Sequence, residues 1–247
     1  AMHFSLGAAT AGLLPAEGVL TYPKKYTRIV LQQLQPAEPR VRLAALGDLP
    51  ALLELEEHWK SDVLAASEDT LRRRITAHPT GQFVAVSADG RLLGAMYTQR
   101  VASYDVLLTA QRETELELHT PTGPVVQLLG VVQRPEAAVG DMLRKYVLLL
   151  GRLEATVERA CGVTRCRAYD ASSGKEYRAY VEEGTDPGLL FHSEAGATIG
   201  EVVPDYRPRD TANLGYGVMI CYELRAKARR TAVRSAHVDV ARGGTAA

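Results

Sequence analysis

The spacing of apolar and polar residues predicts regular secondary structure over most of the chain, beginning with a short strand and two helices. The stretch VRLAAL at residues 41–46 predicts the strand. Apolar residues at helical spacing predict a first helix, which begins at the turn Gly-Asp-Leu-Pro and ends near Trp59. A second helix is expected over residues 67–77, because Ser-Glu-Asp-Thr is a capping pattern and the following His-Pro pair stops a helix.

The next elements are predicted to be a β-hairpin and a buried strand. Two apolar runs flank residues 87–90, whose Asp-Gly pair is a turn signal between antiparallel strands. The unbroken apolar run VVQLLGVV at residues 125–132 is typical of a strand that is buried on both faces. Gly130 within this run predicts a bulge or a close approach of another backbone segment.

The second half of the chain continues with a long helix. After the loop of residues 133–140, apolar residues recur at positions i, i+3 and i+4, which predicts an amphipathic helix. These residues are Met142, Leu143, Tyr146, Leu149, Leu150, Leu153 and Val157. We expect a strand over residues 162–168, a helix over 174–183 and a last strand over 217–224.

Residues 186–217 are predicted to form a long loop that carries the chemistry of the protein. Their sequence, DPGLLFHSEAGATIGEVVPDYRPRDTANLGYG, places His192 and Arg207 among many glycines and prolines, which favour turns. Long loops on a rigid scaffold are common places for catalytic and binding residues. A functional site is therefore expected here.

The composition is that of an ordinary globular protein. The chain has 247 residues, of which 46% are hydrophobic and 23% are charged. Its 29 basic residues balance its 29 acidic ones, so no overall field attracts nucleic acid or a membrane. The sequence carries no apolar run of membrane-spanning length and no secretory signal at its start, which predicts a cytoplasmic protein.

Breaks in the pattern predict three parts of the chain. Residues 1–40 are expected to be an N-terminal linker or extension, because prolines and glycines interrupt their apolar runs. Residues 41–224 are expected to form one compact α/β domain. The basic tail of residues 225–247 is expected to be a partly disordered linker.

Cysteines and nucleophile motifs exclude several kinds of chemistry. Cys161, Cys166 and Cys221 lack the spacing of a metal site, so we expect no metal and interpret all three as reduced, structural thiols. The sequence has no G-x-S-x-G elbow and no Cys-His pair at catalytic spacing, which argues against hydrolase chemistry.

The order of the predicted elements resembles the GNAT (Gcn5-related N-acyltransferase) fold over residues 41–224. This resemblance implies an α/β protein with a central mixed, mostly antiparallel sheet flanked by helices. In that family the loop between the long strand and the long helix holds the phosphates of coenzyme A or phosphopantetheine with backbone amides. Here that loop would run from Arg134 to Gly140, although only Gly140 is recognisable from the family's Q/R-x-x-G-x-G/A signature.

Four positions make the chain more similar to one branch, the GNAT-like decarboxylase domains in curacin-type loading modules of modular polyketide synthases. These positions are Trp59 in EEHWKSD, Thr164 in GVTRCRAY, His192 in DPGLLFHSEAGA and Arg207 in VPDYRPRDTANLGYG. The branch shares distant features with malonyl-CoA decarboxylase. The resemblance implies that Thr164 and His192 are catalytic and that Trp59 and Arg207 bind substrate, whereas each of these residue types on its own is more often structural.

The implied activity is that of a carboxy-lyase, which decarboxylates a malonyl, methylmalonyl or dimethylmalonyl thioester on an acyl carrier protein to make a polyketide starter group. The resemblance implies no cofactor of the protein's own. The substrate brings its phosphopantetheine arm, for which coenzyme A can substitute. The implied partners are the acyl carrier protein and neighbouring synthase domains, with no nucleic acid and no membrane. Two alternatives remain open: an S-acyltransferase that moves an acyl group from coenzyme A to the carrier protein, and a non-catalytic GNAT-like scaffold.

Overall fold

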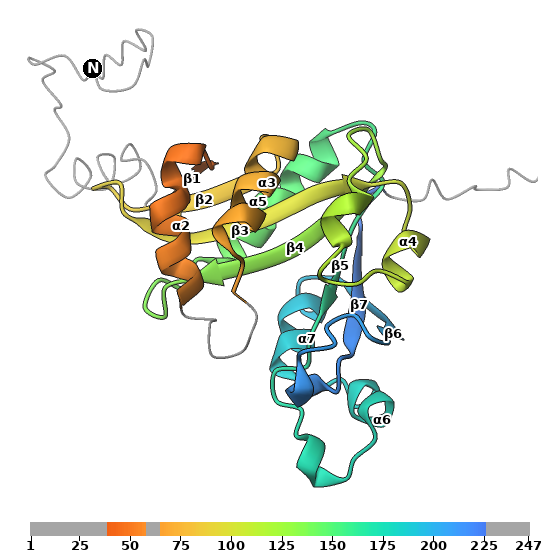
Figure 1. Cartoon of the computed structure of the whole chain (residues 1–247). Helices are drawn as coiled ribbons and strands as arrows, with labels where there is room; N and C mark the ends of the chain where they lie inside the picture. The colour runs from red at the N-terminus through yellow and green to blue at the C-terminus, as the bar shows by residue number, and fades with distance from the viewer. Residues whose placement is uncertain (1–38, 58–64, 226–247) are drawn as a thin grey trace, which may run out of the picture. The chain divides into compact units, whose positions relative to one another are not determined.

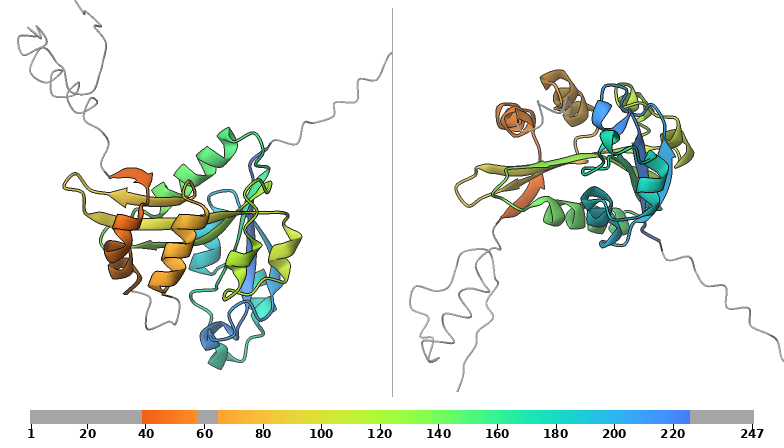
Figure 2. Two further views of the ribbon diagram at one scale, coloured as in Figure 1. Left: turned by 45° about the horizontal axis from the view of Figure 1, so that its top comes forward. Right: turned by 90° about the horizontal axis from the view of Figure 1, so that it is seen from below.

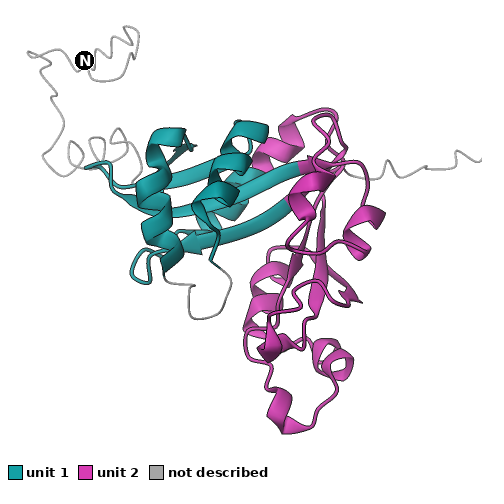
Figure 3. Cartoon of the chain, in the orientation of Figure 1, with its two compact units in different colours: residues 1–99, 128–147 teal, residues 100–127, 148–247 magenta. Residues whose placement is uncertain are grey.

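The computed structural model describes residues 39–57 and 65–225 (Figure 1), so Trp59 and nearly all of the predicted N- and C-terminal linkers lie outside the described residues. The chain divides into two compact units (Figure 3). Unit 1 comprises residues up to Gln99 together with Leu128–Val147, and unit 2 comprises Arg100–Gln127 together with the residues from Leu148 onward.

The strands of unit 1 confirm the predicted hairpin. Strand β1 (Arg40–Leu43) pairs antiparallel with β2 (Gln82–Val86), which pairs antiparallel with β3 (Leu92–Val101). The turn between β2 and β3 contains Gly90 at a φ of 86°, a left-handed conformation that glycine adopts without strain. The buried strand β4 (Val125–Gln133) follows, and hydrogen bonds order the strands as β1-β2-β3-β4-β5-β7-β6.

The helices of unit 1 lie on both faces of its strands. Helices α2 (Leu49–Glu56) and α3 (Glu68–Ala77) cover one face, and α5 (Gly140–Leu153) lies on the other (Figure 2). A single 3-10 turn, η1 (Leu46–Asp48), precedes α2. The predicted cap of α3 is confirmed, because the Ser67 side chain accepts a hydrogen bond from the Thr70 backbone N–H.

Three details of the prediction for β4 and α5 are wrong. Helix α5 ends at Leu153, before Val157, and its buried positions include Leu143 and Val147. The residues predicted to face the core are partly outside it, since Leu149 and Leu153 are 51% and 72% exposed. Leucine is so frequent in this helix that more than one stripe fits the period. Of the two features predicted at Gly130, a bulge or a close backbone approach, the close approach is wrong, because a Cβ atom there would meet nothing within 4 Å.

In unit 2 the strand β7 (Gly217–Glu223) lies between two partners. It pairs antiparallel with β5 (Arg159–Thr164) on one side and with β6 (Thr198–Val203) on the other. The remaining elements are α4 (Asp105–Leu108), η3 (Glu115–Leu118), η4 (Ala171–Ser173), α6 (Tyr177–Glu182), α7 (Pro187–Ser193) and η5 (Thr211–Asn213).

Two predictions about unit 2 need correction. Residues 186–217 are not one long loop, because they contain helix α7, strand β6 and the short helix η5. Strand β5 begins earlier than predicted and ends at Thr164, so residues 165–168 are already outside the sheet. Strand β6 was not predicted because it has only six residues and lies in a stretch whose many glycines and prolines indicate turns.

The cysteine prediction is also wrong, because the structure joins Cys161 and Cys221 as a disulfide. The two residues are direct cross-strand partners in β5 and β7, with their Cα atoms 4.1 Å apart. They are separated by 60 residues in the sequence, so their pairing depends on strand register that the spacing of cysteines does not reveal. Cys166 is a free, buried thiol, as predicted.

Candidate active site

Thr164 is the last residue of β5, where the strand leaves the sheet of unit 2. It lies opposite Val218 of β7 and is half-buried. The neighbouring Gly217 allows a close approach of the chain, because a Cβ atom on it would lie 2.2 Å from Val163 Cγ1 and 3.0 Å from Tyr206 Cδ1. The Val163 side chain and the Tyr206 ring therefore both lie against Gly217, where any larger residue would place its side chain.

His192 lies in the last turn of the short helix α7 and is also half-buried. Its Nδ1 atom is 2.8 Å from the hydroxyl oxygen of Tyr222, a buried residue of β7. The ring of Phe191 lies edge-on to the imidazole, with the ring centres 5.0 Å apart. The imidazole is thus held on one side by the strand that also pairs with the strand of Thr164.

Asp186 fixes the beginning of α7 with a fully buried carboxylate. Its Oδ1 accepts hydrogen bonds from the N–H groups of Gly188 at 2.7 Å and Leu189 at 3.3 Å. Its Oδ2 accepts from the Ala168 N–H at 2.8 Å and the Tyr180 hydroxyl at 3.2 Å. Four donors compensate the buried charge, and one carboxylate ties the helix of His192 to the segment that follows Thr164.

That segment, residues 165–168, we call the β5 exit segment, and it also holds the stretch that carries Arg207. The Cys166 N–H donates to Oδ1 of the buried Asn213 at 2.9 Å. The guanidinium of Arg165 forms an ion pair with Asp210 at 3.1 Å. Both contacts join residues that are more than 40 positions apart to the segment directly after Thr164.

Arg207 presents a guanidinium whose buried Nε atom has no hydrogen-bond partner among the described residues. The group lies over the ring of Tyr206, 5.4 Å from its centre. Burial, followed by the positive charge of Arg112, lowers the pKa of Arg207. A carboxylate ligand would relieve both effects, so this arginine is suited to bind an anion.

A buried carboxylate supports the aromatic platform under Arg207. Glu115, which is 1% exposed, accepts hydrogen bonds from the Tyr206 hydroxyl at 2.5 Å and from Gln127 Nε2 at 3.2 Å. It also forms an ion pair with Arg112. Burial, together with the negative charge of Glu115, raises the pKa of Tyr206, so this phenol remains neutral and keeps donating to the carboxylate.

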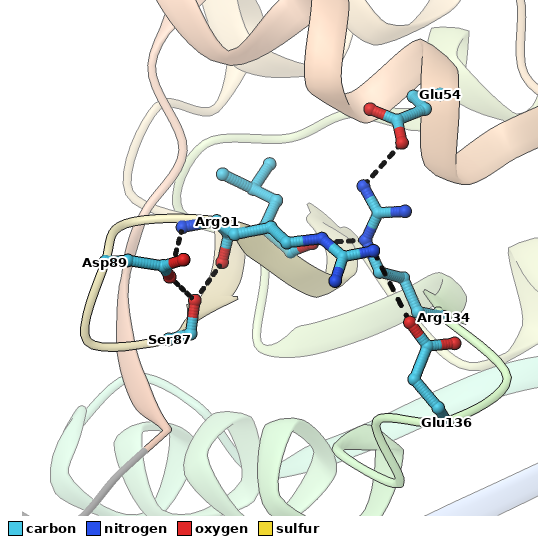
Figure 4. Close-up of polar contacts among 7 residues, drawn as sticks. Glu54, Ser87, Asp89, Arg91, Arg134 and Glu136 are labelled. Atoms are coloured by element: carbon cyan, nitrogen blue, oxygen red, sulfur yellow. Dashed lines mark hydrogen bonds and ion pairs between the residues drawn. The ribbon is translucent and has the colours of Figure 1, made fainter.

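The loop that was expected to face phosphate belongs to unit 1. Figure 4 shows the Arg134 guanidinium directed toward Glu54, with which it forms an ion pair at 2.7 Å, and Glu136 directed toward Arg91. Arg134 Nε also donates to the backbone oxygen of Leu92 at 2.8 Å. The Gly140 N–H donates to Gln133 Oε1 at 2.6 Å. The side chain of Arg134 and the amide of Gly140 are therefore both engaged within the protein.

The structure brings three of the six predicted site residues into one unit. Thr164, His192 and Arg207 all belong to unit 2, whereas Arg134 and Gly140 belong to unit 1 and Trp59 lies outside the described residues. Sequence reasoning missed two of the groups that hold them, Tyr222 and Asp186, whereas Asn213 already belonged to the residues considered as supporting groups of the site. Asp186 had a readable signal, because an aspartate directly before Pro-Gly is typical of a helix N-cap.

The described part of the chain offers neither a metal site nor a membrane-spanning helix. Within residues 39–57 and 65–225, no cluster of three or more histidine, cysteine, aspartate or glutamate side chains has the arrangement needed to hold a metal ion. Among the same residues, none of the helices combines the length and apolar character that a membrane span requires.

Two solved structures resemble this chain closely. The GphF GNAT-like decarboxylase in complex with isobutyryl-CoA is 37% identical, with a TM-score of 0.71, over 75% of this chain and 100% of that one. The loading GNATL domain of CurA from Lyngbya majuscula is 34% identical, also with a TM-score of 0.71, over 76% of this chain and 98% of that one.

A more distant structure shares the fold alone. Ard1 from Thermoplasma volcanium is 12% identical with a TM-score of 0.52, over 77% of this chain and all of that one. Comparisons with protein-family models and with curated proteins gave no match.

Proposed function

Because the chain belongs to the GNAT-like decarboxylases of the curacin loading-domain type, we propose that it decarboxylates a malonyl-type thioester carried by an acyl carrier protein. The acyl group is malonyl, methylmalonyl or dimethylmalonyl, and the product is the starter acyl thioester of a polyketide synthase. The observation that carries this proposal is the buried Nε of Arg207, which has no hydrogen-bond partner among the described residues and belongs to the same unit as Thr164 and His192. In this proposal Arg207 binds the substrate carboxylate, and Thr164 and His192 are the two donors for the thioester.

The reaction breaks the bond between the α-carbon and the carboxylate carbon. The electron pair of that bond moves into the thioester to form an enolate, and carbon dioxide leaves. The enolate then takes a proton at the α-carbon from water or a nearby acid, which gives the acyl thioester. No redox step occurs and no metal is needed to balance the reaction.

His192 and Thr164 are the proposed catalytic residues. Negative charge grows on the thioester oxygen as the enolate forms, and donors aimed at that oxygen lower the barrier. An imidazole N–H and a hydroxyl group are both suitable donors, and each such contact is typically worth about 3 kcal/mol. Because each residue acts as a donor and not as a nucleophile, no acyl-enzyme forms.

Arg207 and Trp59 are the proposed substrate-binding residues. The guanidinium of Arg207 would orient the carboxylate in the ground state, and its buried Nε would gain the partner that it lacks among the described residues. An arginine that holds the carboxylate too tightly would oppose its loss as neutral carbon dioxide. The contact of the guanidinium with the Tyr206 ring, whose centre lies 5.4 Å away, limits how closely it follows the substrate.

The phosphopantetheine arm of the carrier protein is the proposed ligand of the Arg134–Gly140 loop, and coenzyme A is its surrogate. Since the Arg134 guanidinium and the Gly140 N–H already have partners, we expect the contact to come from other backbone amides of the loop. No cofactor of the protein's own is proposed. We expect the carrier protein and neighbouring synthase domains as partners, and a cytoplasmic location.

Mass spectrometry of a loaded carrier protein tests the proposal. Incubating malonyl- or methylmalonyl-carrier protein with the enzyme is expected to remove the mass of carbon dioxide, and His192→Ala or Thr164→Val is expected to slow this step strongly. Arg209→Gln, a change at an exposed arginine two residues from Arg207, serves as the control and is expected to leave the rate unchanged. A mass loss no faster than the uncatalysed background would refute the proposal.

The same samples separate the two alternatives. A transferase would acylate holo carrier protein directly from acetyl-CoA, without any malonyl substrate. A non-catalytic scaffold would leave the starter-loading activity of the whole synthase intact after His192→Ala.

A further inference from the structure

The imidazole of His192 and the phenol of Tyr222 form one hydrogen bond whose direction determines what His192 can do. The two atoms, Nδ1 and the hydroxyl oxygen, are 2.8 Å apart. Tyr222 is 2% exposed and lies in β7, opposite Ala160 of β5. It comes from the sheet, whereas His192 comes from the helix, so the contact fixes the ring against a rigid neighbour.

Acid–base chemistry favours the phenol as the donor in this contact. A phenol O–H, which loses its proton near pH 10, is a more acidic donor than the N–H of a neutral imidazole. The unprotonated imidazole nitrogen, whose conjugate acid has an ordinary pKa of about 6.5, is in turn a far stronger acceptor than a neutral phenol oxygen. A phenol O–H that donates to the imidazole lone pair is therefore favoured over an imidazole N–H that donates to the phenol oxygen. Nδ1 then acts as the acceptor, and the proton of the neutral ring resides on Nε2.

This tautomer is the one that the proposed reaction requires. An Nε2–H group donates to the thioester oxygen as it becomes negative, which lowers the barrier. The opposite tautomer would direct the lone pair of Nε2 at the growing negative charge and would raise the barrier. The direction of the Tyr222 contact thus distinguishes an active from an inactive imidazole.

We propose that Tyr222 is a positioning residue of the decarboxylase, which holds His192 as a neutral Nε2–H donor and fixes the orientation of its ring. This inference rests on the proposed function, in which His192 stabilises the enolate. Tyr222 itself touches His192 and not the reacting atoms. It therefore acts through the imidazole: its contact at Nδ1 determines that the proton resides on Nε2, the nitrogen that faces the substrate in this proposal.

The first test reads the tautomer without using activity. Long-range proton–nitrogen NMR spectra of protein labelled with nitrogen-15 histidine distinguish a protonated from an unprotonated ring nitrogen. The His192→Gln variant identifies the His192 signals among the six histidines of the chain. We expect the proton on Nε2 in the wild-type protein near neutral pH, and a proton on Nδ1 would overturn the proposal.

The second test is the Tyr222→Phe variant, which removes the hydroxyl and keeps the ring. We expect the turnover number kcat to fall about tenfold, with KM within about twofold of the wild-type value, because the lost contact positions a group that acts in the transition state. The matched control is Tyr104→Phe, whose hydroxyl contacts Glu201 instead. This control is expected to keep the wild-type kcat.

The outcomes separate this inference from the proposed function. A Tyr222→Phe protein with wild-type kcat and wild-type His192 signals would overturn the positioning role and leave the decarboxylase intact. If the wild-type protein does not decarboxylate any carrier-bound malonyl thioester, the function is refuted, while the NMR spectra still decide whether Tyr222 sets the tautomer. A fall in kcat with an altered His192 signal supports the proposal.

Discussion

Replacing Asp186 should destabilise unit 2 more than any exposed helix cap does, because this carboxylate is fully buried and accepts four hydrogen bonds. Asp186→Ala removes the cap of α7, which typically costs about 1 kcal/mol. It also leaves the buried N–H groups of Gly188 and Leu189 without an acceptor, at about 1–3 kcal/mol for an unsatisfied group. We expect the free energy of unfolding to fall by about 2–4 kcal/mol.

Asp186→Asn separates the loss of the helix cap from the loss of the contact to the β5 exit segment. Asparagine caps a helix about as well as aspartate, so the contacts to Gly188 and Leu189 survive. Its amide NH₂ would then face the Ala168 N–H, which places a donor against a donor. We expect an intermediate loss of about 1–3 kcal/mol, all of it from the contact between α7 and the β5 exit segment.

Denaturant unfolding followed by circular dichroism measures these losses, and a thermal scan should show a drop of roughly 10 °C for Asp186→Ala. The matched control is Glu176→Ala, which removes the exposed cap of α6 and its one contact to the Ala179 N–H. This control should cost less than about 1 kcal/mol. If Asp186→Ala costs no more than Glu176→Ala, the buried carboxylate does not hold α7 in the way described.

Three further predictions concern Arg207 and the cysteines. Arg207→Gln should lower kcat/KM for decarboxylation roughly 10–100-fold, since a hydrogen bond to a charged group is worth about 1.5–3 kcal/mol. The free energy of unfolding of this variant should be equal or higher, because a buried charge is removed. A destabilised variant would contradict this expectation. Alkylation of the denatured protein should label Cys166 alone without reduction and all three cysteines after reduction. Three labels without reduction would refute the disulfide. The disulfide should stabilise the fold by about 4 kcal/mol, because it closes a loop of 60 residues. Burial raises the pKa of the Cys166 thiol from 9.0 to about 11. The stability that the neutral thiol contributes is therefore complete below pH 9 and is lost as the pH rises through 11. The free energy of unfolding of Cys166→Ala should accordingly depend less on pH in this range.

The local parts of the fold could be predicted from the sequence. The hairpin around Gly90, the Ser67 cap and the buried strand β4 each depend on residues that are neighbours in the chain. The α/β GNAT fold with a mostly antiparallel sheet is confirmed, and it followed from the order of such elements. The buried face of α5 was not predictable, because its consecutive leucines fit several helical stripes and only the tertiary packing selects one.

The site was predictable only as far as its motifs reach. The motifs placed Thr164, His192 and Arg207 in the chain, and the structure adds the groups that hold them. Tyr222 meets His192 from 30 residues away, and Asp186 and Asn213 meet the β5 exit segment from 18 and 47 residues away. Such partners depend on strand register and on how the chain returns to the sheet, which hydrophobic periodicity does not encode. The disulfide was missed for the same reason.

The β5 exit segment also limits how this domain can be recombined with its relatives. Its backbone and side chains contact Asp186, Asp210 and Asn213, which surround both His192 and Arg207 in the sequence. A chimaera that takes the Arg207 stretch from a relative but keeps the native β5 exit segment would have to form the contacts to Asp210 and Asn213 between residues from two different proteins. Exchanging residues 164–216 as one piece keeps these contacts within a single source, but Glu115 and Tyr222, which contact Tyr206 and His192 from outside that piece, then have to match it.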